Sequence, residues 1–304
     1  MDYQEIIDRI YREVQPLTAQ GKVADYIPAL SSVDRNNLGI SVHHTKGEKY
    51  GVGQVNIPFS IQSISKVFSF TLAYEAVGEA IWERLGKEPS GTAFNSLVQI
   101  EYEHGIPRNP FINAGALVVA DIILSNYRYP WREFLEFVRN ISNDDTIDSN
   151  EEVARSEKET GHRNAALAHL MYGFKNIKNP VEEVLDFYFM QCAIEMCAES
   201  LSRSFLFLAN HGVVPYSGEA LLSLSQAKRL NALMLMAGLY NESGDFAYKV
   251  GLPGKSGVGG GIVAVFPKNL SICVWSPAIN EYGNSVAGIE ALKRFTSYTE
   301  MSVF

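Results

Sequence analysis

The sequence predicts a mixed α+β fold, in which an antiparallel sheet is flanked by helices and an all-helical domain is inserted into the chain. Strand-like segments occur only towards the two ends, at residues 38–55 and 259–275. Residues 73–224 carry helical apolar spacing without clear strands. The terminal segments, residues 6–14 and 286–295, also have helical spacing. The two ends would therefore build one sheet-and-helix layer around the inserted helices.

Each element is expected from its own pattern. In chain order these are an amphipathic helix carrying Ile6 to Val14, strands at Leu38–Val42 and Tyr50–Val55, a largely buried helix beginning near Ser63, a hairpin of Ile262–Phe266 and Ser271–Trp275 that turns at Pro267–Asn269, and a terminal helix carrying Val286 to Phe295. We expect residues 1–75 and 220–304 to form the sheet-and-helix layer and residues 76–219 the inserted domain, with the catalytic site between them.

Composition excludes several classes of function. With 304 residues and 46% hydrophobic content, the chain can bury a full core. A net charge of −8, without a cluster of lysine and arginine, argues against nucleic-acid and anionic-membrane surfaces. The acidic N-terminus lacks the apolar core of a secretion signal, and no stretch approaches membrane-spanning length. A small-molecule substrate and a cytoplasmic protein are expected.

Cysteine and histidine usage points away from metals and disulfides. Three cysteines, Cys192, Cys197 and Cys273, fit a reducing compartment, and the first two lie in a helical pattern typical of a core. The six histidines have no repeated metal-ligand spacing, so we expect no metal and no other cofactor. In the acidic stretch before residue 152, Asp148 or Ser149 is expected to cap a helix.

Two short motifs suggest a serine acyl-transfer site. In Ser63-Ile64-Ser65-Lys66, residues three apart share one helix face, so Ser63 and Lys66 would lie within reach of one another. Burial would lower the pKa of Lys66 into the range of a general base that activates the serine. A second Ser-x-x-Lys, Ser225 to Lys228, opens another apolar pattern and fits a helix N-cap and a solvated face better.

The second motif is Lys255-Ser256-Gly257, which comes at the start of the predicted C-terminal strands. Penicillin-recognising serine hydrolases carry Ser-x-x-Lys on a helix and Lys-(Ser/Thr)-Gly on a facing edge strand, in that order. A phosphate-binding loop is the rival interpretation of Gly254-Lys255-Ser256. It fails because Lys249 occupies the first glycine position and a strand follows where a helix is required.

The chain resembles the serine-dependent glutaminases, a branch of the β-lactamase-like serine hydrolase superfamily. The resemblance spans nearly the whole chain. Six blocks in the family's order carry it: Gly21–Pro28, Gln62–Lys66, Gly86–Gly91, Asn109–Ala116, Ser156–Glu157 with Gly161–Asn164, and Val250–Gly261. It implies a β-lactamase-like fold and hydrolysis of L-glutamine to L-glutamate and ammonia through an acyl-enzyme on Ser63. It also implies Lys66 as general base and a homo-oligomer, either a dimer or a tetramer.

The resemblance also implies roles for individual residues. The family's substrate-contacting positions fall on Ser63, Asn113, Glu157, Asn164, Tyr188, Tyr240 and Val258, with Gln62, Lys255, Ser256 and Gly257 in support. Glu157 suits the α-ammonium of glutamine, while the three neutral donors Asn113, Asn164 and Tyr188 suit its carboxylate and side-chain amide. Backbone N–H groups of Ser63 and Val258 would bind the oxyanion. Tyr240, assisted by Tyr26, would relay a proton to the leaving ammonia.

Several alternatives stay open from the sequence. Taken singly, Asn164 fits a helix cap, Tyr188 a core aromatic and Glu157 a solvated acid. A related serine amidase or esterase with another acyl substrate, or an idle binding protein, would carry the same motifs. Gly254 replaces the alanine more usual in the family, which should loosen the loop slightly. The chain lacks a Ser-Asp-Asn motif before Lys255, which disfavours β-lactam hydrolysis.

Overall fold

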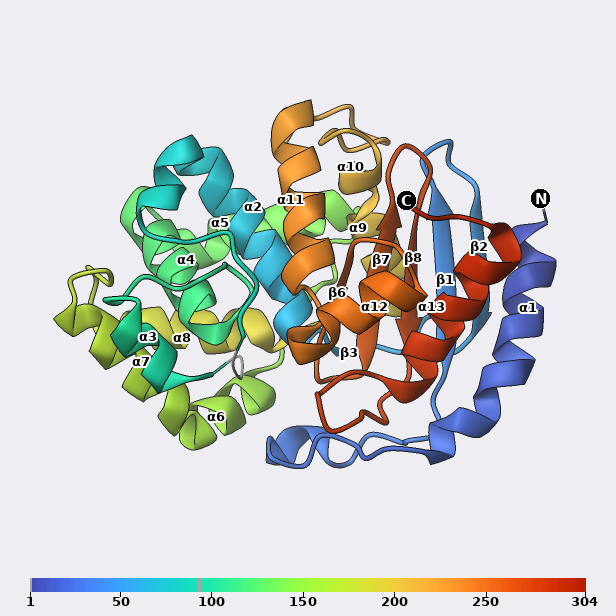
Figure 1. Cartoon of the computed structure of the whole chain (residues 1–304), viewed down its shortest axis with the longest axis horizontal. Coiled ribbons are helices and arrows are strands. Elements are labelled where there is room, and N and C mark those ends of the chain that lie inside the picture. The colour runs from blue at the N-terminus through green and yellow to red at the C-terminus, as the bar shows by residue number, and fades with distance from the viewer. Residues whose placement is uncertain (1, 92–94) are drawn as a thin grey trace.

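The computed structural model describes residues 2–91 and 95–304 and contains the predicted sheet at one end of the molecule (Figure 1). Its strands run antiparallel in the order β2-β1-β8-β7-β6. They are β1 (Gly39–His44), β2 (Lys49–Gly53), β6 (Gly254–Ser256), β7 (Gly261–Phe266) and β8 (Leu270–Trp275). The predicted strand segments and the C-terminal hairpin are confirmed, and the short strand carrying Lys255 lies at an edge of the sheet.

Both faces of the sheet are covered, because side chains of a strand alternate between its faces. In β7, Ile262 joins the core made with α1 (Tyr3–Val14) and α13 (Val286–Thr299), whereas Val263 joins the larger core on the opposite face. Figure 1 shows the blue helix α1 and the red helix α13 side by side along the sheet. The predicted antiparallel sheet flanked by helices is confirmed.

Helices dominate the rest of the molecule. They are α2 (Ser65–Val77), α3 (Leu97–Tyr102), α4 (Asn113–Asn126), α5 (Pro130–Ser142), α6 (Glu151–Thr160), α7 (His162–Gly173), α8 (Val181–Cys192), α9 (Ala198–Ser204), α10 (Leu206–Ala209), α11 (Leu224–Ala237) and α12 (Ser243–Lys249). Short 3₁₀ helices are η1 (Gln15–Ala19), η2 (Pro28–Leu30), η3 (Gln62–Ile64), η4 (Gly78–Glu83) and η5 (Tyr240–Glu242). Within the described ranges, none of the helices is long and apolar enough to cross a membrane. The domain boundaries at residues 75 and 219 stay a prediction.

A second, small sheet contradicts the prediction that residues 73–224 contain no strands. It pairs β3 (Phe59–Ser60), β5 (Ile194–Met196) and β4 (Asp148–Ser149) in the order β3-β5-β4. Strands of two or three residues are too short for a periodic pattern to reveal them. The sheet places the segment before Ser63 beside the segments that flank α6 and α8, so it assembles the walls of the site described below.

Two predicted helix caps are wrong by two residues or fewer. The N-cap of α6 is Asn150, whose side chain accepts from the backbone N–H groups of Glu152 and Val153, while Asp148 and Ser149 form β4. The N-cap of α11 is Ser223, which forms a reciprocal capping box with Gln226. Neighbouring polar residues offer equivalent cap oxygens, and the sequence pattern alone does not fix which of them begins the helix.

Gly254 does not loosen a loop, contrary to the prediction. It lies buried within β6, and a Cβ built on it would meet Phe246 Cε1 at 2.8 Å and Leu239 Cδ1 at 3.3 Å. The space that an alanine would need at this position is occupied by these two side chains. Gly254 is therefore matched to its neighbours rather than a source of flexibility.

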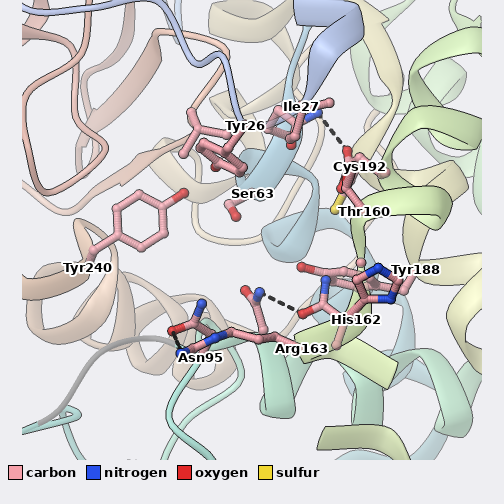
Figure 2. A pocket seen from close by; sticks show the side chains of 16 residues that line it. Tyr26, Ile27, Ser63, Asn95, Thr160, His162, Arg163, Tyr188, Cys192 and Tyr240 are labelled. Atoms are coloured by element: carbon pink, nitrogen blue, oxygen red, sulfur yellow. Dashed lines mark hydrogen bonds between the residues drawn. The ribbon is translucent and has the colours of Figure 1, made fainter. Parts of the chain in front are cut away.

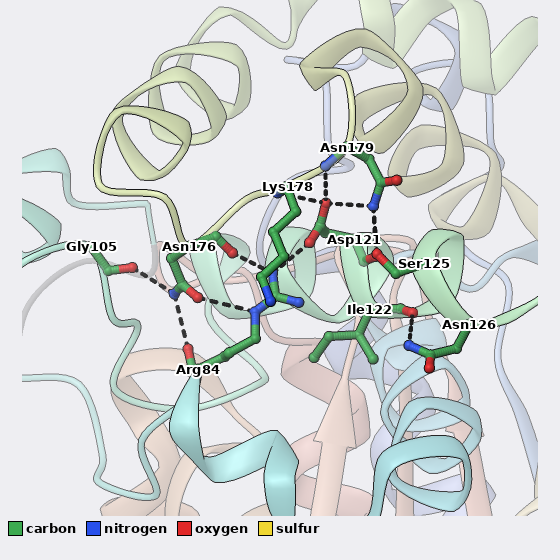
Figure 3. Close-up of polar contacts among 9 residues, drawn as sticks. All are labelled: Arg84, Gly105, Asp121, Ile122, Ser125, Asn126, Asn176, Lys178 and Asn179. Carbon is green, nitrogen blue, oxygen red and sulfur yellow. Dashed lines mark hydrogen bonds and ion pairs between the residues drawn. The ribbon is translucent and has the colours of Figure 1, made fainter.

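A buried polar cluster ties the helices together (Figure 3). Asp121 on α4 is fully buried and pairs with the Arg84 guanidinium at 2.5 Å. Its other oxygen accepts the backbone N–H groups of Lys178 and Asn179, at 3.0 and 2.8 Å. Asn176 donates its amide to the carbonyl of Arg84. The chain following η4 and the connection between α7 and α8 are thus anchored on α4.

Candidate active site

One cavity of about 390 Å³ collects most of the predicted site residues. It is lined by Tyr26, Ile27, Gln62, Ser63, Asn95, Asn113, Glu157, Thr160, Gly161, His162, Arg163, Asn164, Tyr188, Cys192, Tyr240 and Val258. Figure 2 shows the hydroxyl of Tyr240 directed towards Ser63, with Tyr26 on the neighbouring wall. A volume of this size suits a small metabolite.

Ser63 is placed by a strained turn. It lies in η3, between the small sheet and α2, and the preceding residue Gln62 has a left-handed φ of 50°. Tyr240, at the start of η5, has a similar φ of 51°. Non-glycine residues in this region carry strain that clusters at functional sites. Burial raises the pKa of Tyr240, and a side-chain hydrogen bond with Ser63 opposes that rise.

Lys66 lies on the first turn of α2 and is fully buried. Its Nζ donates to Asn113 Oδ1 at 2.7 Å and to the carbonyl of Phe111 at 3.2 Å. Burial lowers the pKa of Lys66 to about 8, against a smaller opposite effect of the acidic groups of Cys192 and Glu157. The predicted depression of the lysine pKa is present, and an amine with that pKa is largely able to accept a proton in mildly alkaline solution.

Glu157 is the buried carboxylate of the cavity. It is only 7% exposed, so it is not the solvated helical acid that its position on α6 allowed. Burial raises the pKa of Glu157 to about 7, while a hydrogen bond from Gln62 and the charge of Lys66 lower it. Gln62 Nε2 donates to Glu157 Oε1 at 2.8 Å and to Ser60 Oγ at 2.9 Å. A buried carboxylate of this kind is suited to bind a cation.

Two asparagines continue the polar wall from Lys66. Asn113 Nδ2 donates to Asn164 Oδ1 at 2.9 Å, so the three side chains form one chain of hydrogen bonds. Asn164 lies within α7, whose N-cap is Gly161, and it is therefore not a helix cap. Tyr188 on α8 is buried against the same cavity, and burial raises its pKa well above the ordinary value.

The glycine-rich turn after β6 lies against the segment that leads to Ser63. A Cβ on Gly257 would meet the carbonyl oxygen of Ile61 at 2.3 Å, and one on Gly259 would meet that of Ser60 at 2.1 Å. Only glycine allows this backbone approach. Val258, between the two glycines, is thereby placed with Ser63 on the lining of one cavity.

Not every predicted residue lines the cavity. Lys66, Lys255, Ser256 and Gly257 are buried behind the lining, whereas Tyr26 is on the lining but 56% exposed. Of the residues predicted for the core, Cys192 also lines the cavity, and Cys197 is only partly buried because its Sγ caps α9. Sequence reasoning did not single out the lining residues Ile27, Asn95, Thr160, Gly161, His162, Arg163 and Cys192 for a role in the site. The matching blocks Gly21–Pro28 and Gly161–Asn164 contain Ile27, Gly161, His162 and Arg163, and these blocks were the signal that could have identified them.

Comparison with known proteins gives a consistent result. The family profile described as Glutaminase matches residues 21–304. The chain belongs to the glutaminase family. A glutaminase of Aliarcobacter butzleri is 53% identical over 305 residues, and the match covers all of both chains. One of Agrobacterium fabrum is 55% identical, with 100% of this chain and 99% of the relative covered.

The structural likeness to glutaminases is equally extensive. The solved structure of a probable glutaminase from Bacillus subtilis, complexed with 6-diazo-5-oxo-L-norleucine, superimposes with a TM-score of 0.89 at 36% identity. That match covers 100% of this chain and 98% of the other. The β-lactamase-like fold expected from the resemblance is confirmed for this glutaminase-family chain.

Proposed function

We propose that the chain hydrolyses L-glutamine to L-glutamate and ammonia through an acyl-enzyme on Ser63. The proposal rests on family membership and on one observation: Ser63, Tyr240 and the buried carboxylate of Glu157 line a single cavity. A nucleophile and a cation-binding carboxylate in one small cavity are what an amino-acid amidase requires.

The chemistry assigns one task to each group. Lys66, as the neutral amine, takes the proton of Ser63 while Oγ bonds to the side-chain amide carbon of glutamine. Backbone N–H groups of Ser63 and Val258 hold the oxyanion. When the carbon–nitrogen bond breaks, Tyr240 donates a proton to the departing nitrogen, which leaves as ammonia. Lys66 then passes the proton it took from Ser63 to Tyr240. Tyr26 assists from the cavity wall. Water then cleaves the ester and restores the proton of Ser63.

Recognition of glutamine is assigned to the polar walls. Glu157 takes the α-ammonium, because it is the carboxylate on the lining and is already oriented by Gln62. Asn113, Asn164 and Tyr188 take the α-carboxylate and the amide as neutral donors. Lys255, Ser256 and Gly257 support the turn that carries Val258. We also propose a cytoplasmic homo-oligomer, a dimer or tetramer, supported by the cysteine usage and the family resemblance.

Release of ammonia and glutamate from L-glutamine tests the function. We expect Ser63→Ala to lower kcat at least about 10³-fold, since the other machinery leaves only weak residual catalysis. The matched control is Ser225→Ala, which removes the exposed serine of the other Ser-x-x-Lys motif and should leave turnover unchanged. Asparagine serves as the second substrate. Turnover that persists without Ser63, or asparagine turned over faster than glutamine, would contradict the proposal.

A further inference from the structure

Lys255 is a buried lysine to which the proposed chemistry gives no proton and no substrate contact. It lies in the edge strand β6 with 0% of its surface exposed, and its Nζ donates to the carbonyl of Ser256 at 2.5 Å. Burial and the neighbouring charge of Lys66 lower the pKa of Lys255 well below its ordinary value. The lowered pKa reflects the cost of burying an ammonium, so the protonated form of Lys255 depends on partners that compensate its charge.

Besides the carbonyl of Ser256, Lys255 has a second partner, the ring of Tyr240. Lys255 Nζ lies 4.6 Å from the centroid of that ring, within the range of a cation–π contact. Tyr240 is itself held in a left-handed backbone conformation and contacts Ser63 through its hydroxyl. Lys255 thus contacts a ring whose hydroxyl contacts Ser63.

This placement separates Lys255 from the substrate. Tyr240 lines the cavity and Lys255 does not, so a molecule bound in the cavity meets the ring and not the ammonium. In a Lys-(Ser/Thr)-Gly motif that faces a substrate, the lysine would offer its charge directly to a carboxylate. Here the group that receives the charge is an aromatic ring.

We infer that Lys255 is a positioning residue for Tyr240: its ammonium holds the ring so that the hydroxyl meets Ser63, and stabilises the ring as the hydroxyl gives up a proton. The inference rests on the proposed function. The attraction between a cation and a phenol ring grows as negative charge develops on the phenol oxygen. The benefit therefore falls on the transition state more than on bound glutamine.

Steady-state kinetics of Lys255→Met and Lys255→Gln test the inference. Both remove the charge at similar length, and the glutamine amide can still donate to the Ser256 carbonyl. We expect kcat to fall roughly 30-fold, the factor that corresponds to a desolvated cation–π contact, with KM within about threefold of wild type. Circular dichroism and labelling of Ser63 by 6-diazo-5-oxo-L-norleucine establish that the variants are folded. The exposed Lys249→Met is the control and should match wild type.

A double-mutant cycle with Tyr240→Phe identifies the route of the effect. Phenylalanine keeps the ring and removes the hydroxyl, so the change at Lys255 should cost less than about threefold in that background. A full 30-fold loss there, or a tenfold rise in KM with kcat intact, would overturn the inference and make Lys255 a structural residue or a substrate ligand. Loss of glutamine turnover in Ser63→Ala is independent of these outcomes, so the proposed function and the role of Lys255 fail separately.

Discussion

Single residues of the site carry opposing demands of burial and charge. Lys66 and Glu157 are both buried, and each would be costly as an isolated ion. Burial lowers the pKa of the amine to about 8 and raises that of the carboxyl group to about 7. Both shifts bring the pKa towards neutral pH, so acid would affect substrate binding and proton transfer together in the proposed mechanism.

The pH dependence of kcat/KM follows from the pKa shifts of Lys66 and Glu157. In the proposed mechanism, Lys66 is a base only when neutral, which holds above its pKa. Glu157 would bind an ammonium only when ionised, which also holds above its pKa. We therefore expect log kcat/KM to fall with a slope of 1 as the pH drops below 8. Below pH 7 this slope should approach 2, because the second group is then also protonated.

Glu157→Gln provides the control for this profile, since it removes one of the two titrating groups. Its acid limb should keep a slope of 1 down to low pH, on a kcat/KM that is lower throughout. A wild-type profile that is flat between pH 6 and 8 would contradict both assignments.

At the level of residues, the motifs predicted more than periodicity could. Ser63, Asn113, Glu157, Asn164 and Val258 line the cavity because the matching blocks that contain them preserve positions in space. Tyr188 and Tyr240 also line it, although they lie outside those blocks. The contact between Lys255 and Tyr240 was not predicted, since the two residues lie in different elements and no pattern encodes the distance between them. Cys192 was assigned to the core because an apolar helix face looks the same whether it meets packed side chains or a cavity.

At the level of elements, buried polar contacts fix the relative positions of helices that apolar packing alone would leave free to shift. The carboxylate of Asp121 accepts both from Arg84 and from the backbone that connects α7 to α8. Since α7 carries Asn164 and α8 carries Tyr188, this cluster sets the position of two cavity residues without touching the cavity.

Asp121→Ala should lower the free energy of unfolding by about 3–5 kcal/mol, because it leaves the Arg84 guanidinium and two backbone N–H groups buried without their acceptor. Urea titration followed by circular dichroism measures the change. The matched control is Glu136→Ala, which breaks the exposed ion pair with Arg132 and should cost less than about 1 kcal/mol. Equal losses in the two variants would contradict the role given to the buried pair.

Long elements were predictable and short ones were not. The hairpin of β7 and β8 was found from its alternating apolar residues, whereas β3, β4 and β5 are only two or three residues long. Their pairing depends on contacts between segments more than 40 residues apart, such as Ser60 Oγ with the carbonyl of Cys192 at 3.0 Å. Tertiary pairing of this kind leaves no local signal.

At the level of the whole molecule, the first and last helices of the chain cover one face of the sheet. Ile7, Ile10 and Val14 of α1 are buried in the core shared with α13, on the side of the sheet away from the helical body. Glu13 also joins the two helices by an ion pair with Arg294 at 2.5 Å. The sheet is therefore a middle layer whose covering depends on the first and last helices.

Ile10→Ala tests how much the packing of α1 on the sheet contributes to stability. We expect a loss of about 2–5 kcal/mol in the free energy of unfolding, from lost burial and the cavity left in the core. Activity of the folded protein at 25 °C should be retained, because the substitution is on the opposite face from the cavity. Glu5→Ala, exposed on the same helix, is the control for thermal unfolding. An unchanged melting temperature for Ile10→Ala would mean that α1 is not part of the cooperative core.

Gln62 connects recognition to reactivity in a way that limits how such a site can diverge. The side-chain amide of Gln62 orients Glu157, the carboxylate assigned to the amino group of the substrate. The backbone of the same residue forms the turn that places Ser63, the proposed nucleophile. A lineage that exchanged Glu157 to accept a different amine would also release the amide next to Ser63. New substrates are therefore easier to reach through Asn164 and Tyr188, on α7 and α8, than through Glu157 or the turn at Val258, which lies against Gln62.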